Sequence, residues 1–309
     1  MRAVCVFPGQ GSQRVGMGSD VSAQEPVARQ VFQEADDALG FSLSRLCFEG
    51  PSEQLELTEH AQPAILTTSV ALWRVLEDRT ALIPVAMAGH SLGEWTALVV
   101  AGAVGLADAV RAVRERGRLM QSAVPVGVGA MAALIGTDLV AATALCADAA
   151  DGQVLVPANL NGGGQVVVAG HSTAIDRLLL IARERRIRAQ KLAVSAPFHC
   201  PLMAPAAAGL DAYLALLTFL PLRWPVITSV EARMVAAATE LRRLLVAQVT
   251  GPVRWEETAQ ALQAIAPSVA LEVGPGQALR GLFKRIAPQL PVLGVGDVAG
   301  LAAATAALQ

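Results

Sequence analysis

Charged and aromatic residues are scarce in this sequence, and this excludes several classes of protein. Of its 309 residues, 16% are charged and 4% aromatic, so Ala, Val and Leu must fill the core. A formal net charge of −2 gives no basic footprint, and we expect no nucleic-acid partner. No apolar run reaches the ~20 residues of a membrane-spanning helix, so we expect no membrane partner. Residues 1–7 are typical of a buried strand and lack the features of a signal peptide.

Cysteine is also scarce, and its spacing excludes two kinds of stabilisation. The four cysteines match neither a zinc site nor a disulfide framework: Cys5, Cys47, Cys146 and Cys200. We expect isolated thiols that pack as small hydrophobic groups in a reducing, cytoplasmic environment. The sequence predicts no metal and no other cofactor.

Strand-like runs alternate with helical patterns, which predicts an α/β fold with a parallel sheet. The length of the chain suffices for a large domain with a smaller insert. The predicted strands of the large domain lie at 3–7, 83–88, 225–230 and 269–273, the last two each followed by a helix. Its main predicted helices lie at 62–79, 94–101 and 107–121.

The middle of the chain has a different order of elements, strand-helix-strand-strand-helix-strand. The predicted strands are 130–136, 153–160, 165–170 and 188–194, and the helices are 139–150 and 172–186. Ser172 is the expected N-cap of the second helix. This order is that of a split βαβ, or ferredoxin-like, unit. We expect an inserted domain at 127–195, within a large domain formed by 1–126 and 196–309.

Ser91 stands in the most informative motif, Ala-Gly-His-Ser-Leu-Gly-Glu at 88–94. Gly-x-Ser-x-Gly between a strand and a helix is the pattern of a nucleophile elbow. The sharp turn leaves room only for Gly89 and Gly93, and the following helix directs its N–H groups toward the group that the serine attacks. The alternative is a glycine-rich turn with an incidental serine.

A serine nucleophile needs a base, and His199 is the best candidate among the four histidines. It follows a predicted strand at the point where the insert returns to the large domain, and it follows the serine in chain order. His90 is interpreted as structural, His171 as a solvated turn residue and His60 as a possible helix cap. The group that orients His199 stays open: a neutral group, or one of Asp211, Glu231, Glu256 and Glu272.

Two further segments supply candidate site residues. The glycine-rich loop at 8–13 can direct backbone N–H groups into the site, as a second oxyanion donor beside the N–H of Leu92. Arg116 lies on the apolar stripe of the predicted helix 107–121, together with Val113 and Met120. A buried arginine needs an anionic partner, either inside the protein or as the carboxylate of a substrate.

Together these segments closely resemble the malonyl-CoA:acyl carrier protein transacylases of fatty-acid synthesis and the acyltransferase domains of polyketide synthases. The matching pieces cover nearly the whole chain in order. They are Phe7-Pro-Gly-Gln-Gly-Ser-Gln13, Gln62-Pro-Ala64, Gly89-His-Ser-Leu-Gly-Glu94, Arg116-Gly117, Gly129-Ala-Met131, Gln165-Val-Val167, His199, Gln248, Pro252-Val253 and Glu272-Val-Gly-Pro-Gly276.

The resemblance implies an α/β-hydrolase-like large domain and a specific role for each site residue. Ser91 would be the nucleophile, His199 the base and Arg116 the clamp for the malonyl carboxylate. The resemblance further places oxyanion donors at the backbone of Gln10 and Leu92, assigns the orientation of His199 to Gln248, and makes Phe198 a marker of malonyl selectivity. The sequence departs from the family pattern at Trp95, at the turn 161–164 and at Ser229.

The implied activity is ping-pong transfer of malonyl from malonyl-CoA to the phosphopantetheine thiol of an acyl carrier protein. Separately, we expect a monomer. A serine hydrolase or thioesterase shares Ser91 and His199, but it has no use for a buried Arg116. An inert docking subunit and the transacylase subunit of malonate decarboxylase are further alternatives. Carrier proteins are acidic, so a basic dock is expected; the candidates are Arg183, Arg185, Arg186, Arg188 and Lys191.

Overall fold

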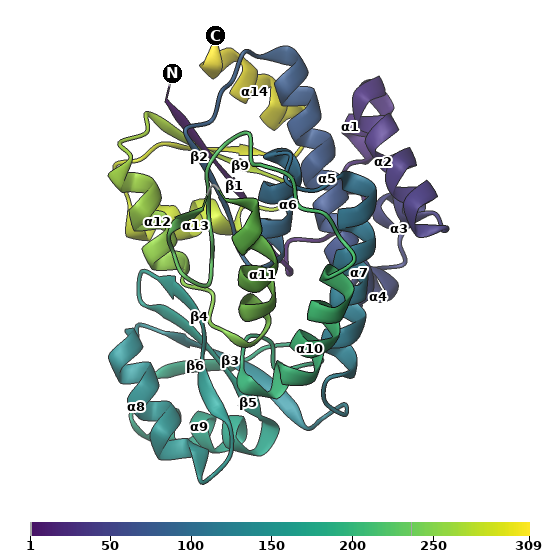
Figure 1. Ribbon diagram of the computed structural model, residues 1–309. Coiled ribbons are helices and arrows are strands. Elements are labelled where there is room, and N and C mark those ends of the chain that lie inside the picture. The colour runs from purple at the N-terminus through teal and green to yellow at the C-terminus, as the bar shows by residue number, and fades with distance from the viewer. Residues whose placement is uncertain (1, 236) are drawn as a thin grey trace.

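A computed structural model describes residues 2–235 and 237–309, which form two β-sheets surrounded by helices (Figure 1). The large sheet has the strand order β10-β9-β1-β2-β7-β8, and the small sheet the order β4-β5-β3-β6. The strands of the large sheet are β1 (Ala3–Phe7), β2 (Ala86–Gly89), β7 (Val226–Ile227), β8 (Met234–Val235), β9 (Val269–Val273) and β10 (Val292–Val295).

The large sheet is parallel except at one edge, where β8 pairs antiparallel with β7. The predicted strands 3–7 and 269–273 are confirmed with these bounds. The strand predicted at 225–230 is only two residues long, and a strand follows it where a helix was expected. In the centre of the sheet, Phe7 of β1 pairs with Gly89 of β2. The loops that follow these two strands therefore emerge side by side, as the ends of parallel strands do.

Side chains of β1 alternate between two cores, as the pleat requires. Ala3, Cys5 and Phe7 face the largest hydrophobic cluster, whereas Val4 and Val6 face a second one. The helices around the large sheet are α1 (Ser19–Gln24), α2 (Pro26–Leu39), α3 (Leu43–Glu49), α4 (Ser52–Leu55), α5 (Thr58–Arg79), α6 (Leu92–Val100), α7 (Leu106–Ser122), α10 (Ala204–Leu214), α11 (Leu241–Thr250), α12 (Trp255–Ala264), α13 (Ala278–Ile286) and α14 (Val298–Leu308), with 3₁₀ turns η1 (Pro201–Met203) and η2 (Ala238–Glu240).

The small sheet lies with α8 and α9 at the bottom of Figure 1 and has the predicted element order. All its neighbouring strands are antiparallel. Ser172 begins α9, but the N-cap position belongs to His171, whose side chain makes no capping hydrogen bond; the predicted cap is therefore wrong by one residue. The elements are β3 (Gly129–Ile135), α8 (Leu139–Ala150), β4 (Leu155–Gly162), β5 (Gln165–His171), α9 (Ser172–Glu184) and β6 (Arg188–Lys191).

The two faces of the small sheet have different partners. One face packs against α8 and α9, where Leu134 meets Leu145 and Leu178. The other face contributes Met131 and Val167 to the largest cluster of the chain. This shared core fixes the small sheet against the large one. No helix in the described residues is long and apolar enough to cross a membrane.

Candidate active site

Ser91 occupies a strained turn between β2 and α6, as the elbow motif predicts. Its backbone has φ 50° and ψ −106°, a left-handed conformation that is costly for a residue with a Cβ. The turn is possible because its flanking residues are glycines. A Cβ on Gly89 would lie 1.8 Å from the backbone of Gly93, and one on Gly93 would lie 2.0 Å from the carbonyl oxygen of Phe7.

His199 lies directly against the serine. Its Nε2 is 2.7 Å from Oγ of Ser91, and its Nδ1 is 2.8 Å from the main-chain oxygen of Gln248. Because a carbonyl oxygen only accepts, Nδ1 must carry the ring proton, and Nε2 is left free to accept the serine proton. Burial, and next the positive charge of Arg116, lower the pKa of His199 to about 3. The imidazole is therefore neutral in the resting site.

A neutral group orients this histidine, which resolves the question that the sequence left open. The group is the carbonyl of Gln248, while the amide of the same residue contacts other groups. Three of the four acidic candidates are engaged elsewhere. Asp211 binds Arg242, Glu231 binds two surface arginines, and Glu272 accepts the N–H groups at the start of α13.

Arg116 is the buried cation of the site, with 2% of its surface exposed. Its Nη1 donates to Oε1 of Gln62 at 2.7 Å, and its Nη2 donates to Oε1 of Gln248 at 2.9 Å and to Oγ of Ser91 at 3.1 Å. All three acceptors are neutral, and its Nε–H has no partner among the described residues. Burial lowers the pKa of Arg116 to about 10, and the charge of Glu94 opposes this shift. The guanidinium remains cationic near neutral pH and lies beside the nucleophile.

Glu94 and Gln248 form a polar cluster behind the serine that was not anticipated from the sequence. Gln248 donates from Nε2 to Glu94 at 2.8 Å and to the main-chain oxygen of Ser91 at 3.2 Å. Ser229, a departure from the family pattern, donates to the same carboxylate from N–H and Oγ. The sequence offered one signal for this cluster: Glu94 is an acidic residue in the first turn of α6, a helix with no other charged residue.

The loop at 8–13 lies against the elbow, as expected. A Cβ on Gly9 would lie 2.4 Å from the carbonyl oxygen of His90, so the loop backbone touches the turn. The side chain of Gln10 accepts a hydrogen bond from Thr58 at 2.6 Å. Leu92 begins α6, so its N–H is one of the free donors at the start of that helix.

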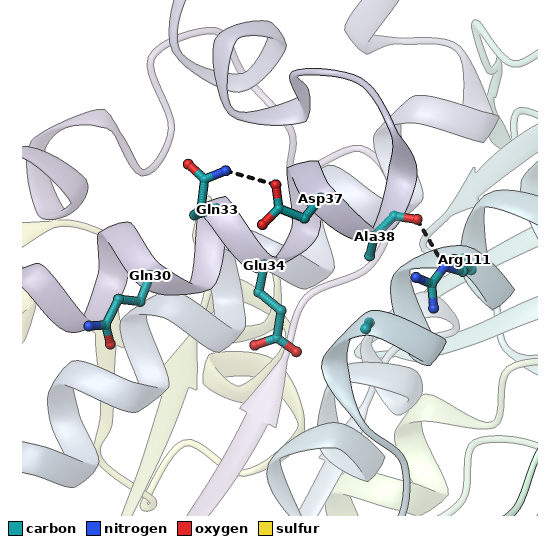
Figure 2. A pocket seen from close by; sticks show the side chains of 7 residues that line it. Gln30, Gln33, Glu34, Asp37, Ala38 and Arg111 are labelled. Carbon is teal, nitrogen blue, oxygen red and sulfur yellow. Dashed lines mark hydrogen bonds between the residues drawn. The ribbon is translucent and has the colours of Figure 1, made fainter.

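A cavity of about 440 Å³ opens beside this loop. Its lining combines the loop with parts of β4, β5 and α13, and includes Gln10, His90, Asn161, Gln165 and Arg285. A second hollow of about 420 Å³, shown in Figure 2, lies between α2 and α7. Apart from Ala38, its labelled side chains are polar or charged, and none of the predicted site residues lines it. The first cavity is therefore the candidate approach to the serine.

The other histidines have structural contacts. Nε2 of His90 is 2.9 Å from Oδ1 of Asn161, which links the elbow to β4. Nδ1 of His171 accepts the N–H of Val154 at 3.0 Å, and Nδ1 of His60 lies 2.9 Å from the carbonyl oxygen of Gln54. Phe198, the predicted selectivity marker, is buried immediately before the base.

The five predicted docking residues are exposed at the end of α9 and along β6, the edge strand of the small sheet. Two of them form ion pairs within the small domain: Arg185 with Asp148 and Lys191 with Asp176, each at 2.7 Å. The cavity beside the loop 8–13 is lined from β4 and β5, whereas β6 lies at the opposite edge of the small sheet from β4. The structure therefore does not bring this cluster to the cavity.

Comparison with known proteins gives the class and then the family. Residues 4–286 match the family described as "Acyl transferase domain", so the chain is an acyltransferase. It is 45% identical over 300 residues to the malonyl CoA-acyl carrier protein transacylase of Escherichia coli strain K12, with 97% of both chains covered. The Bacillus subtilis strain 168 protein of the same name is 42% identical over 294 residues, covering 94% of this chain and 92% of its own. The chain belongs to the malonyl CoA-acyl carrier protein transacylase family.

Solved structures agree in fold. The transacylase of Coxiella burnetii has a TM-score of 0.97 at 42% identity, covering 100% of this chain and 98% of its own. A malonyl-transacylase solved in complex with its type II polyketide synthase acyl-carrier protein has a TM-score of 0.97 at 43% identity, covering 99% and 100%. They share the α/β architecture with a mostly parallel sheet and a second, antiparallel sheet.

Proposed function

We propose that this enzyme transfers a malonyl group from malonyl-CoA to the phosphopantetheine thiol of an acyl carrier protein, through a malonyl ester on Ser91. One observation carries this proposal: Oγ of Ser91 lies between a neutral histidine nitrogen at 2.7 Å and a buried guanidinium nitrogen at 3.1 Å. The imidazole can take the serine proton, and the guanidinium can hold an acyl group that ends in a carboxylate. No cofactor takes part.

In the first half-reaction, Nε2 of His199 accepts the hydroxyl proton while Oγ of Ser91 attacks the thioester carbonyl. The negative charge that develops on the carbonyl oxygen is stabilised by the backbone N–H groups of Gln10 and Leu92. His199 then returns the proton to the departing CoA sulfur, which leaves the malonyl ester on the serine. The carbonyl of Gln248 stabilises the transient imidazolium through Nδ1–H.

In the second half-reaction, His199 accepts the proton of the carrier thiol, and the thiolate attacks the ester. Collapse of the tetrahedral intermediate returns the proton to Ser91 and releases the malonylated carrier. Throughout, Arg116 binds the malonyl carboxylate, and its Nε–H, which has no partner among the described residues, gives it capacity for another acceptor. Phe198, which is buried next to the base, is the proposed marker of malonyl selectivity.

The domain arrangement supports this assignment. We infer an α/β-hydrolase-like large domain from residues 1–126 and 196–309, because β2, Ser91 and α6 form a strand-elbow-helix unit in the centre of a parallel sheet. We infer a ferredoxin-like insert at 127–195 from its element order and its fully antiparallel sheet. We further propose a monomer in the cytoplasm, where the four buried cysteines remain thiols.

Trapping of the acyl-enzyme tests the proposed function. After incubation with malonyl-CoA and removal of free ligand, intact-mass spectrometry should show the added mass of one malonyl group, and peptide mapping should place it on Ser91. Addition of a phosphopantetheinylated carrier protein should remove the adduct and malonylate the carrier. The Ser91→Ala variant should show neither step. A wild-type enzyme that hydrolyses malonyl-CoA without malonylating the carrier would be a thioesterase.

A further inference from the structure

Glu94 is a carboxylate to which the proposed reaction gives no role. It stands three residues after Ser91 and is fully buried. Oε2 of Glu94 accepts from the N–H of Ser229 at 2.8 Å, from Oγ of Ser229 at 2.6 Å and from Nε2 of Gln248 at 2.8 Å. Every group that binds Oε2 donates to it, as an ionised carboxylate requires, while Oε1 has no hydrogen-bond partner among the described residues.

Gln248 connects this carboxylate to the clamp. Its Nε2 donates to Glu94, and its Oε1 accepts from Nη2 of Arg116 at 2.9 Å. A carboxylate can only accept and a guanidinium can only donate, so one orientation of the amide satisfies both. A negative and a positive group are thus held on the two sides of a single amide, in the interior of the protein.

Each charge stabilises the other. Burial raises the pKa of Glu94, and the hydrogen bonds from Ser229 and Gln248 and the charge of Arg116 oppose that rise. Glu94 in turn opposes the lowering of the pKa of Arg116 by burial. The hydrogen bonds of Arg116 all go to neutral oxygens, and Glu94 is the carboxylate whose charge acts on its pKa.

On the basis of the proposed malonyl transfer, we propose that Glu94 is the resident counter-ion of Arg116 and that it weakens the hold of Arg116 on the malonyl carboxylate. The two carboxylates repel each other across the guanidinium. Inside a protein, such a repulsion between unit charges several ångströms apart changes affinity on the order of tenfold. Glu94 is thus a positioning residue that keeps the clamp cationic while the pocket is empty and keeps the loaded malonyl group from being held too tightly for transfer.

Direct binding tests this inference. Binding of malonyl-CoA and acetyl-CoA is measured by titration calorimetry on Ser91→Ala, which cannot be acylated, with and without Glu94→Gln. The glutamine keeps an oxygen for Ser229 and Gln248 and removes the charge. We expect the Kd for malonyl-CoA to fall about tenfold, and the Kd for acetyl-CoA to stay unchanged because acetyl carries no carboxylate. A second neutral variant, Glu94→Met, should shift the malonyl-CoA Kd in the same direction.

The matched control is Glu272→Gln in the same background. Glu272 is also fully buried, but it binds the backbone N–H groups of Leu279 and Arg280. The Glu272→Gln variant should have the same ratio of malonyl-CoA Kd to acetyl-CoA Kd as the Ser91→Ala parent. An unchanged or raised malonyl-CoA Kd in Glu94→Gln overturns the counter-ion role. A Ser91→Ala parent with no preference for malonyl-CoA would contradict the clamp itself, and therefore the proposed function, so the two failures are distinguishable.

Discussion

Arg116 is the residue that most sharply separates a malonyl transferase from a general serine esterase. Loss of a charge-assisted contact in a buried site costs about 2–5 kcal/mol. We expect Arg116→Ala to lower kcat/KM for malonyl-CoA roughly a hundredfold, which corresponds to a loss of about 3 kcal/mol of transition-state stabilisation. Acetyl-CoA makes no contact with the clamp, so its kcat/KM should fall far less. The measurement is the initial rate of transfer from each thioester to the same carrier protein.

A control for this prediction is available on the same helix. Arg114 is partly exposed on α7 and lies over the ring of Phe41, at 4.9 Å from its centroid. Arg114→Ala should leave the ratio of malonyl to acetyl transfer at the wild-type value. An equal loss of both activities in Arg116→Ala would count against the clamp and would indicate a structural role, since Arg116 also holds Gln62 and Gln248 in place.

At the scale of single residues, the sequence identified those site residues that belong to a local sequence pattern. Ser91 was identified by its flanking glycines, and Arg116 by its place on an apolar stripe. The partners of these residues were beyond such reasoning because they come from far along the chain. Gln248 lies 154 positions from Glu94 and 49 from His199. The resemblance implied that Gln248 orients the histidine, but it could not indicate that the main-chain oxygen makes this contact.

Among the elements, the elbow depends on the close packing of β1, β2 and α6. A Cβ on Gly93 would lie 2.0 Å from the carbonyl oxygen of Phe7, and backbone cannot yield as a flexible side chain can. We expect Gly93→Ala to lower the free energy of unfolding by about 3 kcal/mol, the upper range for overpacking, and to reduce acylation of Ser91 because α6 must shift. Thermal unfolding and the rate of malonyl loading measure the two effects.

Gly294 provides the comparison for this element. It lies in β10, and a Cβ there would meet no atom within 4 Å. Gly294→Ala should therefore unfold at or slightly above the wild-type temperature, since alanine loses less backbone entropy on folding. Should Gly93→Ala fold and acylate like Gly294→Ala, the tight elbow would not be what positions the nucleophile.

Elements were predicted well where burial is complete and poorly where strands are short. Strands β1 and β9 are buried at every position, and their apolar runs gave the correct bounds. Strands β7 and β8 are two residues each, too short for any periodicity, so the antiparallel edge was not anticipated. Strand β6 is mostly exposed and ends three residues before its predicted end. These errors lie at or next to the edges of the two sheets, although β7 pairs with β2, the strand that leads into the elbow.

On the scale of the whole molecule, an acidic carrier protein requires a basic docking surface. The predicted cluster retains Arg183, Arg186 and Arg188 outside any ion pair among the described residues, whereas Arg185 and Lys191 are already paired. If this cluster is the dock, the double reversal Arg186→Glu/Arg188→Glu should raise the KM for the carrier about tenfold, since like charges at an interface repel. Loading of Ser91 from malonyl-CoA involves no carrier and should proceed at the wild-type rate.

Salt dependence and a distant arginine make this docking prediction specific. Attraction between exposed charges is screened at high ionic strength, so the difference in carrier KM between variant and wild type should shrink as salt is added. Arg74→Glu, at an exposed position of α5, adds the same kind of charge away from the small sheet and should leave the carrier KM unchanged. A carrier KM that is the same in the double variant, Arg74→Glu and wild type would remove β6 as the dock. The candidate dock would then be α13, where Arg285 lines the cavity beside the loop 8–13.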